Sequence, residues 1–341
     1  MVKTAIIVLN YNGLALMQEF MAALVRCSTG ADIAVADNGS TDASLSWLAQ
    51  HYPELRTLTL EQNLGYAGGY DKAFALLEAQ EKKQNKASYD LYVLINNDVK
   101  VVSGWLDPIV EAFQSNADLV AAQPKIKDLN DLQRFEYAGA AGGYLDAFGY
   151  PFCRGRILNV LEHDHGQYDG PQDIFWASGA CLVLRAKAFE RVGGFDADLF
   201  AHQEEIDLCW RLKANGGRVA CITQSSVYHK GGGTLQSANP RKTFLNFRNS
   251  LLVLIKNVAG PRIVLIVFIR LLLDGLSGLV FLLQGKPKQT LAIVKAHFSV
   301  YRLLPKYFKK RKKWANRLKY AHISSILYAR FIKNRRYFSQ L

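Results

Sequence analysis

Short apolar runs rich in β-branched residues recur over about the first 110 residues of this 341-residue chain. The runs are those at 3–9, 33–36, 56–60 and 92–95. Between them lie turns and stretches with a helical period of apolar positions, seen most clearly at 14–25. Runs that are apolar on both faces predict strands buried in a parallel sheet. The repeated order of strand, turn and helix predicts a doubly wound α/β fold.

The predicted strands end in polar or glycine-rich turns, most clearly where 92–95 runs into Asn96, Asn97 and Asp98. In an open α/β sheet such turns gather along one edge, which is where ligands bind. Hard oxygen ligands at that edge suit a divalent cation holding a phosphate, although an ordinary Asn/Asp turn explains the same residues. The glycines at 65–69 lack the G-x-G-x-x-G spacing, which disfavours an NAD site.

A second set of charged residues lies in a predicted helix at 204–212. Its first turn carries three carboxylates, Glu204, Glu205 and Asp207, where the helix dipole favours negative charge. Capping accounts well for one acidic residue at this position and less well for three. This cluster is therefore a candidate for chemistry.

The segment 115–175 shows little pattern beyond a predicted strand at 119–122, whereas 174–185 predicts a clear strand. Its His-Asp-His sequence at 163–165 has the residue types of a metal site. The surrounding turn residues favour a solvated loop instead.

Charge divides the chain into two regions. Residues 241–341 carry 22 Lys and Arg and one acidic residue, Asp274, whereas the first 240 residues carry 20 basic and 28 acidic residues. The division implies two regions with different partners, which we take as a first domain over 1–250 and a basic, apolar helical region over 251–341. The five cysteines form no C-x-x-C pair and no leader opens the chain, so we expect reduced thiols in a cytosolic compartment.

The basic region contains a 21-residue apolar run at 263–283, long enough to cross a bilayer. A single crossing would place the cationic segment after it outside, against the positive-inside tendency. Helices lying on an anionic cytoplasmic leaflet are therefore favoured over one true span. A nucleic-acid-binding tail is the alternative, but no RNA-binding motif supports it.

Six motifs occur in a fixed order: YNG at 11–13, DNGSTD at 37–42, QNLGYAGG at 62–69, INND at 95–98, WASGACLVLRAKAFERVGGFD at 176–196 and EEIDLCWRL at 204–212. Together they resemble glycosyltransferase family 2, especially its bacterial rhamnosyltransferase- and galactofuranosyltransferase-like branch. The resemblance covers roughly residues 3–250. It implies an inverting enzyme of the GT-A (Rossmann-like) α/β fold, to which the C-terminal region would add a helical, membrane-associating extension.

The resemblance also implies a nucleotide site. Tyr11 and Asp37 would hold the base, and Asp42 and Asn63 would shape the pocket around it.

By the same resemblance, Asn96, Asn97 and Asp98 would form the metal motif that follows a strand, with Asp98 the principal ligand and Asn96 near the ribose and the metal. His229 matches a position that supplies a further ligand, although a lone histidine at a strand end is more often structural. The expected cofactor is Mg²⁺ or Mn²⁺. The family often has Asp where Asn96 stands, so this site carries one charge less.

The family's catalytic base falls on Glu205, with Asp207 as the second choice; the acceptor site would include Glu204 and Trp176, unless Trp176 is a core residue. A base of this kind takes the proton of the acceptor hydroxyl as its oxygen attacks the anomeric carbon. The expected reaction moves a sugar, with rhamnose as the first guess, from a nucleoside-diphosphate sugar to a lipid-linked or glycan acceptor. It would serve cell-envelope polysaccharide synthesis at the cytoplasmic face of the membrane, without nucleic acid. A nucleotidyltransferase or an NAD(P) oxidoreductase is the alternative enzyme class.

Overall fold

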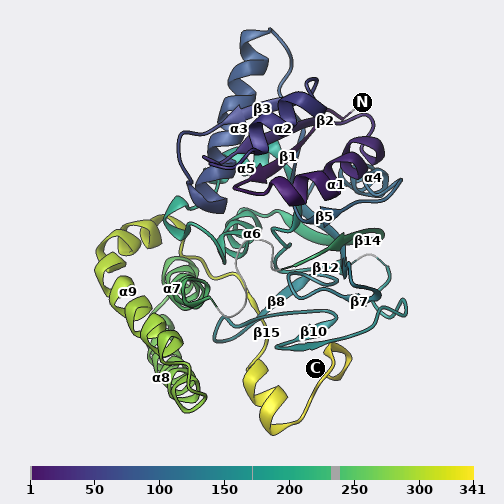
Figure 1. Ribbon diagram of the computed structural model, residues 1–341. Coiled ribbons are helices and arrows are strands. Elements are labelled where there is room, and N and C mark those ends of the chain that lie inside the picture. The colour runs from purple at the N-terminus through teal and green to yellow at the C-terminus, as the bar shows by residue number, and fades with distance from the viewer. Residues whose placement is uncertain (1, 171, 232–238) are drawn as a thin grey trace.

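The computed structural model describes residues 2–170, 172–231 and 239–341. Four parallel strands in the order β4-β1-β2-β3 form its N-terminal part (Figure 1). They are β1 (Thr4–Asn10), β2 (Asp32–Asp37), β3 (Arg56–Thr59) and β4 (Leu91–Asn96), and they alternate with helices α1 (Leu14–Cys27), α2 (Ser44–His51) and α3 (Gly65–Lys83). Side chains on both faces of β1 and β4 are buried, so the predicted strands and helices of this part are confirmed.

Beyond β4 the expectation of a parallel, doubly wound sheet is wrong. Strand β13 (Cys181–Arg185) lies antiparallel between β4 and β6 (Leu119–Asp128), and β14 (Arg218–His229) then runs parallel to β6. The sheet has ten strands, including the short β5 (Val99–Lys100), β7 (Asp131–Phe135) and β12 (Gln172–Asp173). The mixed directions arise because the chain from β6 to β13 leaves the sheet and returns without a crossover helix.

The segment without a clear sequence pattern forms most of a second sheet, in the order β11-β10-β9-β8-β15. Its strands are β8 (Gly143–Asp146), β9 (Pro151–Cys153), β10 (Arg156–Ile157), β11 (Val160–Leu161) and β15 (Ala321–Ile323). Because β15 comes from the end of the chain, the C-terminal region is part of this sheet (Figure 1). The short strands explain the weak periodicity, since two or three residues are too few to show alternation.

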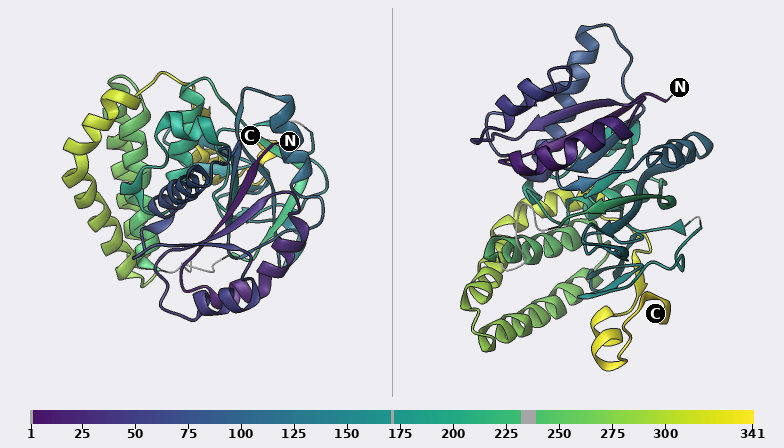
Figure 2. Two further views of the ribbon diagram at one scale, coloured as in Figure 1. Left: turned by 90° about the horizontal axis from the view of Figure 1, so that it is seen from above. Right: turned by 45° about the vertical axis from the view of Figure 1, so that its right-hand side comes forward.

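Helices α4 (Asp107–Ser115), α5 (Ala186–Val192) and α6 (Glu204–Ala214) accompany the large sheet, with a 3₁₀ turn, η1 (Ala197–Leu199), before α6. Three longer helices follow: α7 (Pro240–Asn257), α8 (Arg262–Leu283) and α9 (Pro287–Trp314). They stack beside the two sheets (Figure 2). The chain ends in two short helical turns, η2 (Tyr328–Ile332) and η3 (Phe338–Gln340).

Residue 250, the predicted domain boundary, falls inside α7. Residues 251–257 of this helix are all buried, and α7 packs against α6. The C-terminal half of α7 thus shares the core of the catalytic part, which a charge count does not reveal.

All five cysteines are free. Among the described residues α8 is the one helix long and apolar enough to cross a membrane, and 17% of its most apolar window is buried in the protein.

Candidate active site

The carboxyl ends of β1, β2 and β4 meet at one edge of the sheet, as their order predicts. Asn10 at the end of β1 donates from Nδ2 to Asp37 Oδ1 at 3.2 Å, and Asn97 Nδ2 donates to Asn10 Oδ1 at 3.0 Å. Asp37 is buried, and its Oδ2 accepts from the Ser40 amide at 2.9 Å. The structure therefore joins two predicted nucleotide-site residues, Asp37 and Asn97, through Asn10, a residue that sequence reasoning missed.

Asp42 lies at the rim of this edge and holds two helix starts together. Its Oδ2 accepts from the Leu14 amide at 3.1 Å and its Oδ1 from the Ser44 amide at 3.0 Å. Burial would raise the pKa of Asp42, but these hydrogen bonds outweigh it and hold the pKa below the ordinary value. Tyr11, on the same rim, is 40% exposed, which is compatible with its predicted contact with a nucleotide base.

Asn63 shapes the neighbouring loop before α3. Its Oδ1 accepts from the Gly65 amide at 2.8 Å and from Asn38 Nδ2 at 3.2 Å. Asn38, a second residue that sequence reasoning missed, also accepts from the Leu64 amide at 2.9 Å. Asn38 is part of the DNGSTD motif, and this motif was the sequence feature that could have pointed to it.

The predicted metal residues Asp98 and His229 lie together. Strand β14 pairs with β5 in the register His229 to Val99, which places His229 Nε2 3.0 Å from Asp98 Oδ1. Glu136 Oε2 lies 3.1 Å from the other ring nitrogen of His229. The pKa of His229 is raised to about 10: burial would lower it, but the contacts with Asp98 and Glu136 outweigh burial. Glu136 gave no sequence signal because it lies in the unpatterned segment.

These donors fit a divalent cation once the His229 ring has lost the proton that its raised pKa favours, since only the neutral ring can bind a metal. The remaining ligands would come from a bound diphosphate. The described residues contain no group of three His, Cys, Asp or Glu side chains arranged to hold a metal alone. They do provide a carboxylate and an imidazole in contact with each other, at the tip of β4 where Asn96 and Asn97 add half-buried amides. One carboxylate and mixed oxygen and nitrogen donors suit Mg²⁺ or Mn²⁺ when phosphate oxygens complete the shell.

Helix α6 presents Glu204 and Glu205 at its first turn, as predicted. The Oε2 atoms of both carboxyl groups are buried and have no hydrogen-bond partner among the described residues. Burial raises the pKa of Glu205 to about 7, and burial together with the charge of Glu205 raises that of Glu204 well above its ordinary value. A carboxyl group poised near neutral pH can accept a proton during a reaction.

The model of glycosyl transferase family 2 matches residues 5–193, and that of glycosyl transferase family group 2 matches residues 156–285. This chain belongs to glycosyl transferase family 2. It is therefore a glycosyltransferase, and the nucleotidyltransferase and oxidoreductase alternatives are wrong.

The branch is also as expected, since curated relatives of this family 2 enzyme include rhamnosyltransferases. It is 27% identical over 218 residues to an N-acetylglucosaminyl-diphospho-decaprenol L-rhamnosyltransferase of Mycobacterium tuberculosis. The aligned residues cover 62% of this chain and 71% of the relative. It is 25% identical over 201 residues to the rhamnosyltransferase WbbL of Escherichia coli, which covers 58% and 72%.

Solved structures confirm the GT-A fold. GalNAc-T7, solved with UDP, GalNAc and Mn²⁺, has a TM-score of 0.56 at 14% identity, over 75% of this chain and 48% of that one. The mannosyltransferase PcManGT of Pyrobaculum calidifontis, solved with GDP-Man and Mn²⁺, has a TM-score of 0.50 at 14% identity. The match covers 97% of this chain and 86% of that one. The mixed sheet described above is the form this fold takes in the family 2 enzyme.

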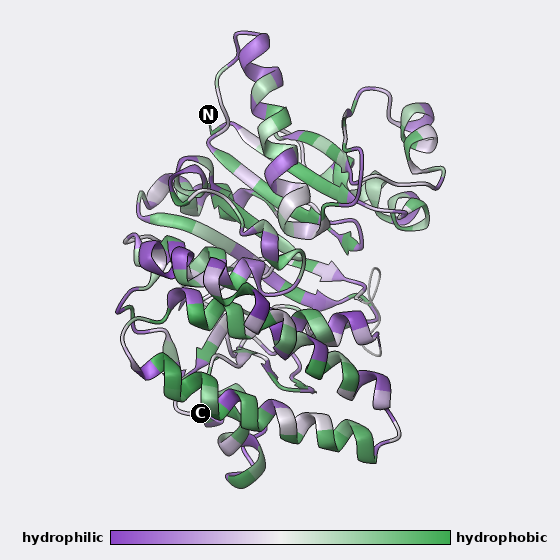
Figure 3. Cartoon of the chain, turned by 90° about the vertical axis from the view of Figure 1, so that its left-hand side faces the viewer, coloured by the Kyte–Doolittle hydropathy of each residue, from purple (hydrophilic) through white to green (hydrophobic). Residues whose placement is uncertain are grey.

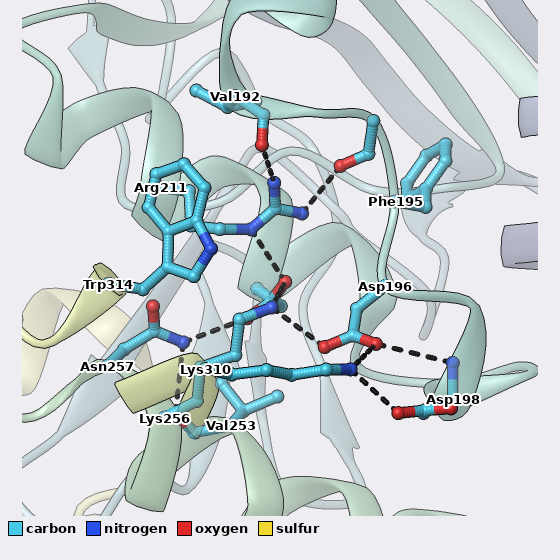
Figure 4. Close-up of polar contacts among 12 residues, drawn as sticks. Val192, Phe195, Asp196, Asp198, Arg211, Val253, Lys256, Asn257, Lys310 and Trp314 are labelled. Carbon is cyan, nitrogen blue, oxygen red and sulfur yellow. Dashed lines mark hydrogen bonds and ion pairs between the residues drawn. The ribbon is translucent and has the colours of Figure 1, made fainter. Parts of the chain in front are cut away.

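Asp207 of the family 2 enzyme has different surroundings from its neighbours Glu204 and Glu205. Three of the residues that bind it, Arg211, Lys256 and Asn257, are labelled in Figure 4. Asp207 is fully buried; its Oδ2 accepts from Arg211 Nε and from Lys256 Nζ, each at 2.8 Å, and its Oδ1 accepts from Asn257 Nδ2 at 2.8 Å. Burial alone would raise the pKa of Asp207, but the two cations hold it far below its usual range. Such a carboxylate is held by donors on both oxygens, which leaves Glu205 as the better base.

Trp176 is 3% exposed and packs in the core. Its Nε1 donates to Tyr144 O at 3.0 Å, and a Cβ added at Gly143 would lie 2.0 Å from its ring. This placement is that of a core tryptophan at a strand end, so the ring has no surface to offer an acceptor in this conformation.

Proposed function

We propose that this family 2 enzyme transfers rhamnose, with inversion, from a nucleoside-diphosphate rhamnose to a lipid-linked glycan at the cytoplasmic face of the cell membrane. The observation that carries the chemical part is the Glu205 carboxyl group at the start of α6, whose buried Oε2 has no hydrogen-bond partner among the described residues and whose pKa is raised to about 7. The two rhamnosyltransferase relatives support the choice of sugar, and the name of the mycobacterial relative supports a lipid-diphosphate acceptor.

In this proposal the donor nucleotide lies on the edge formed by Asn10, Asp37 and Asn97, with its base against Tyr11. Asp98, His229 and Asn96 would hold a divalent cation at the diphosphate, where it would neutralise the charge that develops on the leaving group. Asp42 and Asn63 keep the surrounding loops in place through backbone amides.

Glu205 then performs the proton transfer. Its carboxylate takes the proton of the acceptor hydroxyl while that oxygen bonds to the anomeric carbon and the bond from this carbon to the donor phosphate breaks. Attack from the face opposite the leaving group inverts the anomeric configuration. Burial and the charge of Glu205 raise the pKa of Glu204 well above its ordinary value, which favours the protonated form that can donate a hydrogen bond to the acceptor.

The chemical proposal is tested by offering purified enzyme UDP-, GDP- and dTDP-sugars with a polyprenyl-diphosphate glycan and measuring the released nucleoside diphosphate. We expect turnover with dTDP-rhamnose that stops in EDTA and returns with Mg²⁺ or Mn²⁺. Asp98→Ala should remove metal-dependent donor binding. Full turnover in EDTA, or an active Asp98→Ala enzyme, would contradict the role given to the metal.

The membrane part of the proposal is supported by the distribution of polar and apolar residues on α8. Its polar residues face the protein: Arg270 donates to Phe148 O at 2.8 Å and to Ser250 Oγ, and Asp274 Oδ2 lies 3.2 Å from His297 Nε2 of α9. Figure 3 shows that α8 is apolar along most of its length. Many of its apolar residues are exposed, the most exposed being Val264, Leu265, Phe268, Leu272, Leu276 and Leu283. An exposed apolar face of this size marks a binding surface.

An anionic lipid leaflet suits this surface because α9 adds exposed Leu291 and Phe298 and a basic last turn. The bonds of Arg270 and Asp274 tie α8 to the catalytic part, so we favour a helix that lies in the leaflet over one that crosses it. Full-length enzyme should sediment with anionic liposomes in high salt and need detergent for release. Release by salt alone would contradict this mode of binding.

A further inference from the structure

The segment that leads into α6 has a strained backbone. Phe200, His202 and Gln203 have φ values of 64°, 69° and 73°, in the left-handed region that side chains other than glycine rarely adopt. At Phe200 ψ is −65° and the Ala201 amide donates to Leu199 O at 2.7 Å, which makes a tight three-residue turn. A conformation of this kind persists where its surroundings hold it.

Helix α7 supplies the groups that hold this segment. Asn249 is fully buried, and its Nδ2 lies 2.8 Å from Leu199 O, 2.9 Å from Ala201 O and 2.7 Å from His202 O. Two amide hydrogens thus serve three carbonyl groups.

Arg248 completes this arrangement. Its Nη2 donates to Asp198 O at 2.9 Å and Leu199 O at 3.1 Å. Its Nε donates to Asn249 Oδ1 at 2.8 Å, which turns the amide nitrogen of Asn249 toward the segment.

On its other side the segment contacts the start of α3, beside the predicted nucleotide site. Phe200 O accepts from the Ala67 amide of α3 at 3.1 Å, and a Cβ added at Gly65 would lie 2.4 Å from that oxygen. Every carbonyl group from Asp198 to His202 therefore has a donor, from α7 or from α3. The Gly65 amide also donates to Asn63 Oδ1, so these contacts connect the start of α6 to the loop that shapes the predicted nucleotide site.

We propose that Arg248 and Asn249 are positioning residues that set the place of Glu205 relative to the bound donor by clamping residues 198–202. The proposal rests on Glu205 as the base. It goes beyond that role because it assigns a catalytic purpose to two side chains of α7 that lie outside the predicted donor and acceptor sites.

The experiment compares Asn249→Ala and Arg248→Ala with Asn246→Ala in the full-length enzyme. Asn246 lies one turn earlier in α7, is half-buried, and makes no hydrogen bond to the described residues 197–203, so it is a matched control. We expect kcat to fall about 10- to 100-fold in the first two variants, because small displacements of a catalytic group cost that much. Binding of dTDP with Mg²⁺ and the kcat of Asn246→Ala should remain at wild-type levels.

A second measurement needs no substrate. The carboxyl titration of Glu205 is read by infrared difference spectroscopy against Glu205→Gln. Loosening the clamp admits water, so the midpoint should move from about 7 toward the ordinary value of 4.5 in Asn249→Ala and Arg248→Ala and stay in place in Asn246→Ala.

Loss of thermal stability with kcat per folded enzyme and the titration midpoint both unchanged would overturn the proposal, since a structural role alone predicts that result. If Asn249→Ala does not fold, Arg248→Ala carries the test, because Arg248 is only half-buried. An active Glu205→Gln enzyme would instead overturn the base assignment. An inactive Glu205→Gln enzyme with wild-type behaviour of both α7 variants would overturn the clamp alone.

Discussion

Two acidic sites in the first turns of α6 differ in what surrounds them. In the Glu204–Glu205 pair, the buried Oε2 atom of each carboxyl group has no hydrogen-bond partner among the described residues, and the pKa values of both groups are raised. The Asp207 network, formed by Asp207, Arg211, Lys256 and Asn257, surrounds a fully buried carboxylate with donors, and the pKa of Asp207 is lowered. Both sites hold buried carboxyl oxygens, so the surrounding donors decide which group can accept a proton near neutral pH.

The two sites also depend on different parts of the chain. Lys256 and Asn257 come from the end of α7, and Lys256 also pairs with Asp196 at 2.8 Å, next to Lys310 of α9 (Figure 4). The network thus joins α6 to the C-terminal helices. A cut after residue 250 would remove both α7 partners of Asp207, so it does not separate an intact catalytic domain.

The largest expected effect is that of Glu205→Gln on catalysis. The substitution keeps the shape of the side chain and removes the base, so kcat should fall by about two to four decades while donor binding remains. Steady-state release of nucleoside diphosphate and donor titration measure the two quantities. The comparison would be reversed if Asp207→Asn were the folded, inactive enzyme and Glu205→Gln the active one.

Asp207→Ala should lower the free energy of unfolding. It leaves Lys256 and Arg211 buried without their shared anion, which costs about 3–5 kcal/mol of unfolding free energy. Denaturant unfolding measures the loss. Asp198→Ala is the control, since Asp198 pairs with Lys306 and Lys310 nearer the surface and should cost about 1 kcal/mol or less.

The pH dependence of stability should have opposite signs at the two sites. The pKa of Glu205 is about 7 in the folded state and ordinarily 4.5, so the folded state binds more protons between these values and stability falls as pH rises through them. Glu205→Gln should therefore gain at most about 3 kcal/mol over wild type above pH 7. Asp207 has a lowered pKa, so its stabilisation is complete above its ordinary value of 3.8 and is lost only in acid. Unfolding at pH 5 and pH 8 tests the difference.

The smallest expected effect is the dependence of kcat on pH. Since the base must be deprotonated, kcat should fall about tenfold per pH unit below about pH 7 and level off above it. Single-turnover measurements from pH 5 to pH 9 give the curve. A plateau extending down to pH 5 would mean that the base is a group with an ordinary carboxyl pKa.

Parts of the site that depend on neighbouring residues could be predicted from the sequence. The strand that ends in Asn96, Asn97 and Asp98, and the three acids that begin α6, follow from apolar runs and helix-start chemistry within a few residues. Glu136 and Asn249 could not be predicted in this way. Glu136 meets a histidine 93 positions later in the chain, and Asn249 meets carbonyl groups 47 to 50 positions earlier.

The sequence by itself determined the parallel strands β1 to β4 and the polar edge where they end, because short-range periodicity and turn chemistry encode these features. Its six motifs also carried the resemblance to the family to which the chain belongs. Only the tertiary structure decided the antiparallel place of β13, the union of β15 with β8 and the opposite environments of Glu205 and Asp207. These depend on pairings between distant segments, and a carboxyl group's proton affinity is set by the charges and donors that folding brings to it. Two carboxyl groups two positions apart in α6, those of Glu205 and Asp207, therefore have different chemistry.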